Sequence, residues 1–307
     1  MFLCKYLSET LTGVLIMANT HNPLSAFYRA PKFFTAIPSG GKYYTPDIVE
    51  MPDSNELPVF AMTSKDELIM KNPDALLNGE AVVQVIQSCV PNVKDARRML
   101  SSDIDVLLIA IQGASYGDDI DVTANCPQCE NQCSSVASVD TALSTMGSLQ
   151  DSYTAEVNGL SIKIKPFTYA NTIKAGITNF RSTRSLQALA DIPDEMERLS
   201  LFNENFKQIS ALNYELTAES IESITFTDEN GEKVVVTDRA HLTEFLDNAD
   251  TSVGAAIEKQ ITAINGIGIN LEMQLECDQE ACLDKDKCPK TFTSKVNFDP
   301  VNFSTAS

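Results

Sequence analysis

The chain has 307 residues, of which 43% are hydrophobic, so it is long enough to bury one large core or two modest ones. It carries 42 acidic and 23 basic residues, which gives a formal net charge of −19. This excess of acidic residues argues against binding to DNA, RNA or anionic membrane surfaces, because proteins bind these partners through lysine and arginine. It suits a solvated surface or a basic protein partner.

The chain begins with a stretch of mixed composition, followed by short strands. Residues 1–36 are predicted to form a partly extended N-terminal extension. Its first sixteen residues match a signal peptide poorly, because Glu9 and Thr10 interrupt the apolar run. Residues 37–63 are predicted as strands broken by turns, with a turn signal at residues 39–41 and a short apolar strand around Val59.

A helical layer is predicted over residues 64–116. Ser64 stands three residues before Glu67, the spacing of a capping box, so a helix is expected to start near Lys65. A proline at position 73 should break or restart it. The next segment, EAVVQVIQSCV, is apolar at helical spacing, and Cys89 within it is interpreted as a buried small hydrophobe.

The last helix of this layer is expected to be buried. Ser102 is its expected N-cap and Asp105 its N3 acid, and an apolar run follows that includes Leu107. An aspartate at position 107 should therefore unfold the layer.

The rest of the chain alternates hairpins with helices. Two hairpins are predicted around Asn-Gly turns, in residues 154–166 and 224–238. Helices are predicted over most of 168–220 and over 252–265. The fold class is therefore α+β, a helical layer packed on antiparallel strands and hairpins.

Six of the eight cysteines lie in two clusters, ANCPQCENQC (124–133) and LECDQEACLDKDKC (275–288). In each cluster a predicted strand ends at the first cysteine, and another predicted strand follows the cysteines, as in a zinc-ribbon-like knuckle. Zinc prefers four thiolate or imidazole ligands, supplied as two short-spaced pairs. We predict one closed, structural zinc site whose first-choice ligands are Cys126, Cys129, Cys277 and Cys288.

Alternatives to this ligand set remain open. Cys282 can replace either Cys277 or Cys288, and Cys133 is a spare. The clusters could also be reduced thiols without a metal, or oxidised pairs. A calcium loop at DQEACLDKDK lacks the glycine and terminal glutamate of an EF-hand.

Catalytic chemistry has little support in the sequence. The two histidines are His21, in a polar stretch, and His241, in a predicted surface helix, and neither has the neighbours of a nucleophile–base pair. We therefore expect no enzyme. No stretch approaches the roughly 18 apolar residues of a membrane span, so no direct membrane insertion is expected.

Three ordered blocks carry a family resemblance: IPSGGKYY, MTSKDELIMKNPDALLNGEAVVQVIQSCV and LSSDIDVLLIAIQGASYGDDIDVTANCPQC. They resemble the T4-like bacteriophage baseplate protein family, the hub-type subunits of contractile phage tails. KPFTY (165–169) and NFDPVNF (297–303) are similar to later landmarks of that family, so the resemblance runs from about Ile37 to Phe303. The family's paired-cysteine knuckle corresponds to Cys126 and Cys129 in this sequence. In the second cluster, the cysteines here are farther apart than the tight pair that is usual in the family.

The resemblance implies a structural virion protein of the tail baseplate, assembled in the host cytoplasm, with no known chemistry. Its implied partners are other baseplate, tail hub and tube proteins, in a hetero-oligomer. By its charge, the chain alone should be soluble without forming a closed ring. The alternatives are a tail assembly chaperone absent from the mature virion and a zinc-ribbon nucleic-acid-binding regulator, which should show a basic stripe.

Three regions are predicted along the chain. They are the extension (1–36), a strand and helix region with the first cysteine knuckle (37–138), and a region of hairpins and helices with the second knuckle (139–307).

Overall fold

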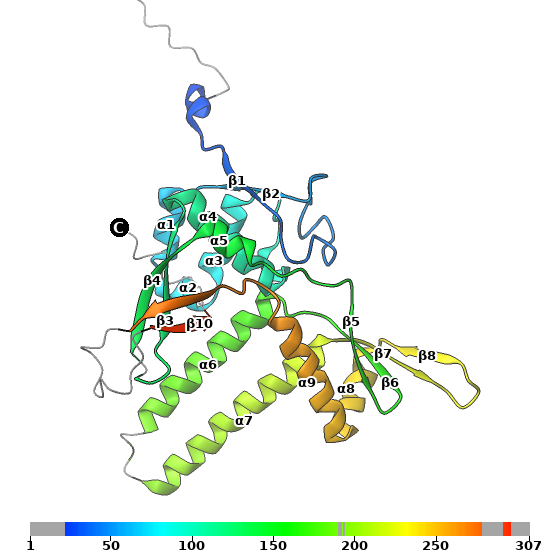
Figure 1. Cartoon of the computed structure of the whole chain (residues 1–307). Coiled ribbons are helices and arrows are strands. Elements are labelled where there is room, and N and C mark those ends of the chain that lie inside the picture. The colour runs from blue at the N-terminus through cyan, green and yellow to red at the C-terminus, as the bar shows by residue number, and fades with distance from the viewer. Residues whose placement is uncertain (1–21, 130, 190–191, 193, 278–290, 296–307) are drawn as a thin grey trace, which may run out of the picture. The chain divides into compact units, whose positions relative to one another are not determined.

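The computed structural model of the chain describes residues 22–129, 131–189, 192, 194–277 and 291–295 (Figure 1). Two compact units separate between Ala30 and Pro31. In the first unit, the Asn22 side chain caps a short 3₁₀ helix, η1 (Pro23–Phe27). The second unit contains strands β1–β10 and helices α1–α9. The predicted boundary after residue 138 lies inside this unit and stays a prediction.

A helical layer packs on a two-stranded ribbon at the start of the second unit. Strand β1 (Pro31–Thr35) pairs antiparallel with β2 (Leu57–Phe60), and the longest helix of the layer packs against both strands. The helices of the layer follow in chain order: α1 (Ser64–Met70), α2 (Pro73–Leu77), α3 (Glu80–Cys89), the 3₁₀ helix η2 (Ala96–Arg98) and α4 (Ser101–Tyr116). The helical layer predicted over 64–116 is thereby confirmed.

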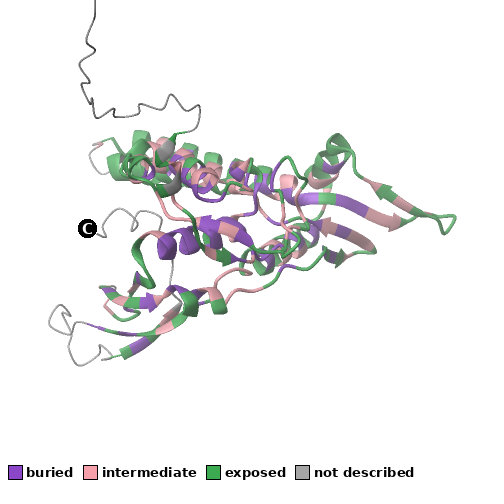
Figure 2. Ribbon diagram, turned by 90° about the horizontal axis from the view of Figure 1, so that it is seen from above, coloured by how far each residue is buried: buried purple, intermediate pink, exposed green. Residues whose placement is uncertain are grey.

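The core of this layer is almost entirely apolar. Helix α4 is buried on most of its faces, and Leu107 is fully buried within it. Cys89, at the end of α3, lies in the same apolar cluster, which confirms its interpretation as a small hydrophobe. Figure 2 shows the buried residues gathered along the helices and strands in the middle of the molecule.

Two predicted helix caps were wrong. Helix α1 is capped by Thr63, whose side chain accepts from the backbone N–H of Asp66 while Asp66 caps the backbone N–H of Thr63 in return. This capping box lies one residue before the predicted Ser64 box. Helix α4 has Leu100, not Ser102, at its N-cap, and no side chain caps it there. Backbone contacts fix this end instead, since the amide of Ser101 donates to the Phe167 carbonyl.

The acid that matters at the start of α4 is Asp103. It is fully buried and accepts hydrogen bonds from the backbone N–H of Ser39, at 2.9 Å, and from the Tyr44 hydroxyl. The Tyr44 oxygen in turn accepts from the Leu100 N–H. Burial raises the pKa of the Asp103 carboxyl, and burial beside Asp103 raises the pKa of Tyr44. This network ties the loop 37–48 to the first turn of α4.

A four-stranded antiparallel sheet forms the second core. Its order is β5-β6-β7-β8, so each strand lies beside its neighbour in sequence. The first predicted hairpin is confirmed, with Asn158 and Gly159 at φ values of 51° and 77° in its turn. The second is confirmed as well, with Gly231 at φ 83° in its loop. The elements are β5 (Tyr153–Val157), β6 (Leu160–Ile164), β7 (Ile221–Thr227), β8 (Lys233–Val236) and the helices packed on them, α8 (Arg239–Asn248) and α9 (Thr251–Asn265).

Two long helices form a hairpin that extends from this body (Figure 1). Helix α6 (Tyr169–Leu189) and helix α7 (Glu195–Ser220) run for about 32 and 39 Å at 1.5 Å per residue. Their interface is polar in part, since the buried Asn205 amide donates to the Ser185 hydroxyl at 2.9 Å. We call this pair the helical arm.

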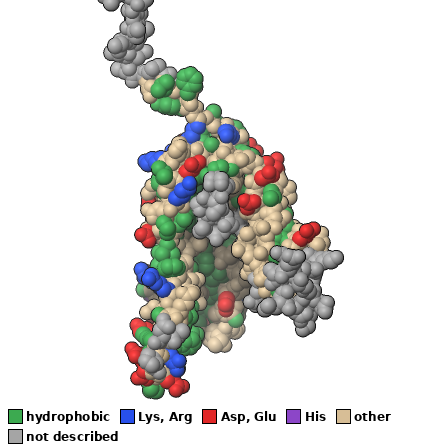
Figure 3. Space-filling view, turned by 90° about the vertical axis from the view of Figure 1, so that its left-hand side faces the viewer, with side chains coloured by type: hydrophobic (Ala, Val, Ile, Leu, Met, Phe, Trp, Pro, Cys, Tyr) green, Lys and Arg blue, Asp and Glu red, His purple; other side chains and the backbone are tan. Residues whose placement is uncertain are grey.

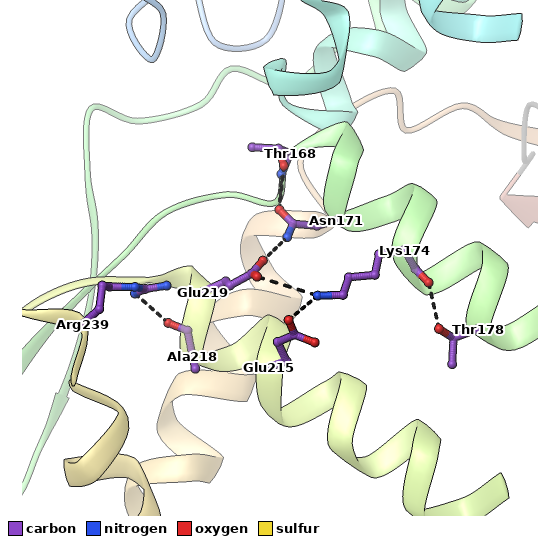
Figure 4. A network of polar contacts seen from close by, with 8 residues as sticks. All are labelled: Thr168, Asn171, Lys174, Thr178, Glu215, Ala218, Glu219 and Arg239. Carbon is purple, nitrogen blue, oxygen red and sulfur yellow. Dashed lines mark hydrogen bonds and ion pairs between the residues drawn. The ribbon is translucent and has the colours of Figure 1, made fainter. Parts of the chain in front are cut away.

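The base of the helical arm is fixed by polar contacts (Figure 4). Lys174 of α6 forms ion pairs with Glu215 and Glu219 of α7, and Asn171 donates to Glu219 at 2.6 Å. Arg239 donates to the Ala218 carbonyl at the end of α7. These contacts hold α6 and α7 together where the arm begins, and Arg239 joins the end of α7 to α8.

Two further antiparallel ribbons complete the fold. Strand β3 (Asp119–Asn125) pairs with β4 (Gln132–Ser138), and β9 (Glu272–Glu276) pairs with β10 (Thr291–Lys295). A short helix, α5 (Val139–Ser144), follows β4 and packs on α4. The fold is thus α+β, as predicted. Among the described helices, none combines the length and apolar character needed to cross a membrane.

Candidate metal centre

The first cysteine knuckle is the turn between β3 and β4. Cys126 follows the last residue of β3, and its N–H donates to the Asn131 carbonyl at 2.9 Å, which closes the turn. Cys129 lies inside the turn, so the CPQC spacing curls the backbone and presents two sulfur atoms from one loop.

The second knuckle begins where β9 ends. Cys277 follows Glu276, and Glu276 pairs with Thr291 at the start of β10. Cys277 therefore occupies the same place after β9 that Cys126 occupies after β3. This repeated arrangement was predicted from the sequence.

Cys277 lies beside the first knuckle because β4 packs against β9. The Sγ atoms of Cys126, Cys129 and Cys277 all lie within 4.8 Å of one another, and those of Cys129 and Cys277 are 3.6 Å apart. Cys277 is about 150 positions away from the other two in sequence. We call the two ribbons and these three cysteines the cysteine clasp.

The sulfur positions fit a tetrahedral zinc ion. A Zn–S bond of about 2.3 Å in a tetrahedron places neighbouring sulfurs about 3.8 Å apart. The Cys129–Cys277 separation of 3.6 Å is close to that value, and Cys126 and Cys277 are both buried. Three soft thiolate donors favour zinc over calcium or magnesium, which take oxygen ligands.

The surroundings of the sulfurs are apolar and small. The cluster contains Leu275 and Phe292 from the β9–β10 ribbon, with Met273 packed against it. Cys133 is buried beside them, but it does not join the group of three sulfurs, and its thiol lies 3.5 Å from the Asn131 carbonyl. Within the described residues, the buried Asn131 amide nitrogen has no hydrogen-bond partner, so a donor remains available beside the knuckle.

The remaining predicted ligands lie outside the described residues. Cys282 and Cys288 belong to the segment 278–290, so the choice between them as fourth ligand stays a prediction. The structure thus brings together three of the five candidate cysteines, one pair from the first cluster and one residue from the second.

With this geometry in place, comparison with known proteins decides the family. Residues 33–292 match the family described as T4 bacteriophage base plate protein. The chain belongs to this family. As a base plate protein, it has its place in the virion tail. No curated protein and no solved structure matches the chain.

One polar site of this base plate protein was not recognised in the sequence. A pocket of about 510 Å³ lies between the start of α4, the loop before α6 and the residues that follow α9. Asp105, which the sequence predicted as a capping acid, lines this pocket instead. Asp105 is exposed to the pocket, but loss of hydration to the surrounding protein atoms, followed by the charge of Asp103, raises its pKa to about 6. The only signal was the four-residue spacing of Ser101 and Asp105, which puts both on one helix face.

Proposed function

We propose that this chain is a non-enzymatic structural subunit of the baseplate hub, or directly attached to the hub, and that one zinc ion stabilises it. The observation that carries the proposal is the family match, which spans the helical layer, the sheet, the helical arm and both cysteine knuckles. We therefore propose that all of these elements together form the structural subunit.

Zinc has a structural task in this proposal. Cys126, Cys129 and Cys277 would hold it together with either Cys282 or Cys288, which closes the tetrahedron. Bound there, zinc supplies stability rather than chemistry, because a site with four protein ligands leaves no open position for a substrate. It joins a loop after β3 to a loop after β9 and closes about 150 residues of chain.

A non-enzymatic role agrees with the placement of His241. It is exposed near the start of α8, with its Nδ1 atom 3.7 Å from the carboxylate of Asp238. Asp238 is the N-cap of α8 and accepts from the His241 backbone N–H. The contact between His241 and Asp238 is therefore part of the cap of α8.

The proposed partners are other baseplate, tail hub and tube proteins, in a hetero-oligomer assembled in the host cytoplasm. A net charge of −19 opposes self-association at low salt and favours partners with basic surfaces. The helical arm and the exposed ribbons offer surfaces for such neighbours.

Quantitative mass spectrometry of purified virions tests the proposal. The chain should be present at a fixed copy number relative to the tail tube protein, and it should remain after the tails are separated from the heads. Its absence from finished particles, combined with failure of baseplate assembly in its absence, would contradict the proposal and identify an assembly chaperone. Salt-dependent binding to DNA by the purified chain would instead support a zinc-ribbon regulator.

A further inference from the structure

A groove runs along one side of the helical arm, where α6 passes α2. It has a volume of about 560 Å³. Its wall on the α2 side is formed by Leu77 and Asn78. Next to this wall, α6 approaches the chain closely, since a Cβ atom at Gly79 would lie 2.4 Å from the Ile173 side chain. The α6 residues that line it are Ile177, Phe180, Arg181, Arg184, Ser185 and Ala188.

The floor of the groove is apolar and open to solvent. Ile177, Phe180 and Ala188 follow one another along one face of α6, because residues three, four, seven or eight apart share a helix face. Phe180 is 47% exposed, and Leu77 on the opposite wall is 38% exposed. Exposed large side chains on two walls of one concave surface are typical of a protein-binding groove.

The rim of the groove is basic. Among the described residues, no carboxylate lies within ion-pair distance of Arg181 or Arg184. Arg97 and Arg98, by contrast, pair with Glu80 and Asp47, the latter at 2.7 Å. Figure 3 shows basic, hydrophobic and acidic side chains along the helical arm, the column at its left. A partner with acidic residues beside an apolar stripe would complement this surface.

We propose that this groove binds an acidic amphipathic helix of another protein. The groove residues extend from Ile177 to Ala188, about 16 Å of helix, which matches about three turns of a partner helix. The apolar face of that helix would cover Phe180 and Leu77, as in other helix-in-groove complexes. Its acidic residues, three or four positions apart, would pair with Arg181 and Arg184, whose guanidinium groups bind carboxylates through two parallel hydrogen bonds.

A second copy of this chain is a poorer occupant. Two chains that each carry a charge of −19 repel one another at low ionic strength, where pairing with the two arginines would be strongest. The partner is defined here by its chemistry alone, so the groove and the baseplate role can fail independently of one another.

The probe for this test is a labelled synthetic peptide of about 14 residues, long enough for three helical turns with capped ends. It carries leucine at positions i, i+3, i+4 and i+7, and glutamate on the adjoining face. A matched peptide has lysine in place of every glutamate. Fluorescence anisotropy with the full chain should show saturable binding of the acidic peptide that weakens as salt is added, and much weaker binding of the basic peptide.

Charge reversal locates the binding site. The double variant Arg181→Glu, Arg184→Glu should lower affinity for the acidic peptide roughly tenfold or more, and the milder pair Arg181→Gln, Arg184→Gln by a smaller factor. Arg198→Glu on α7 is the control, because Arg198 is exposed on the same arm and does not line the groove. It should change affinity less than twofold.

Three results would overturn the proposal. The first is failure of the acidic peptide to bind, or equal binding of both peptides. The second is an equal loss of affinity in the groove variants and in the Arg198 control. The third is a dimer in sedimentation velocity that the groove variants dissociate, which would show that a second copy fills the groove.

Discussion

The helical layer and the cysteine clasp are stabilised in different ways. In the layer, α3 and α4 contribute a long series of buried apolar residues, and Leu107 and Ile86 are fully buried there. In the clasp, two-stranded ribbons meet over a small cluster, in which five of the described residues are buried. A two-stranded ribbon is marginal alone in water, so we expect the proposed metal to stabilise the clasp and to matter little for the layer. A substitution in the helical layer should therefore unfold the protein, whereas a substitution in the cysteine clasp should unfold only the clasp.

Leu107→Asp should have the largest effect. Leu107 has no exposed surface, and an unpaired buried charge costs about 3–5 kcal/mol. Chemical denaturation followed by circular dichroism should show a lost or strongly lowered midpoint. The control is Leu68→Asp, because Leu68 on α1 is 71% exposed and its change should cost less than about 0.5 kcal/mol. A Leu107→Asp protein with the native midpoint would contradict the assignment of the core.

Metal removal should have the next largest effect, and it should be local. Thiolate ligation supplies on the order of 10 kcal/mol in small zinc domains, and part of this should be lost from the clasp. Hydrogen exchange after treatment with a strong chelator, or in Cys129→Ser, should lose protection in β3, β4 and β9. The amides of α4 should keep theirs.

The control for this experiment is Cys133→Ala, which changes a buried cysteine outside the three-sulfur group. It should leave the response to chelator in place. Equal loss of protection in α4 and in the clasp would show that the two regions are not separately stabilised.

Asp105→Asn should have a smaller, pH-dependent effect. The pKa of Asp105 is about 6 in the folded chain and about 3.9 when unfolded. Between those values the folded state binds more protons than the unfolded state, so stability falls as pH rises from about 4 to about 6. Because solvent reaches the pocket, we expect the variant to gain only about 1 kcal/mol at pH 7 and nothing near pH 4. Thermal denaturation at both pH values measures this, and the same gain at both would contradict it.

Lys174→Ala should have the smallest effect. Its two ion pairs join α6 to α7 at partly exposed positions, where each pair contributes about 0.2–1 kcal/mol. Unfolding should shift by at most about 1 kcal/mol, with less shift at high salt. Lys207→Ala is the control, since Lys207 lies on α7 outside this network. A loss of several kcal/mol from Lys174→Ala would mean that the base of the arm is part of the core.

Local signals predicted local structure well. The Asn-Gly turns correctly predicted both hairpins of the sheet. The apolar spacing of residues 80–89 correctly predicted α3. The first knuckle was predictable for the same reason, since CPQC carries its spacing in four residues. The pairing of Cys277 with this knuckle was inferred only because both cysteines follow strands.

Contacts between distant segments were harder to predict. Asp103 takes its role from Ser39 and Tyr44, about 60 residues away, and no pattern in the sequence distinguishes it from Asp105. Similarly, the groove on the helical arm depends on α2 lying beside α6, which helical periodicity cannot show. The prediction of the α4 N-cap was wrong because backbone contacts, rather than a capping side chain, fix that helix end.

Metal analysis of the full chain tests the shared centre most directly. Protein purified under reducing conditions without chelator should contain about one zinc per chain by elemental mass spectrometry. Cys126→Ser and Cys277→Ser should each abolish it, although these residues lie about 150 positions apart, whereas Cys133→Ala should keep it. Changing Cys282 and Cys288 singly would then identify the fourth ligand. A chain without zinc, or zinc that survives either Cys126→Ser or Cys277→Ser, would contradict a metal centre shared between the two ribbons.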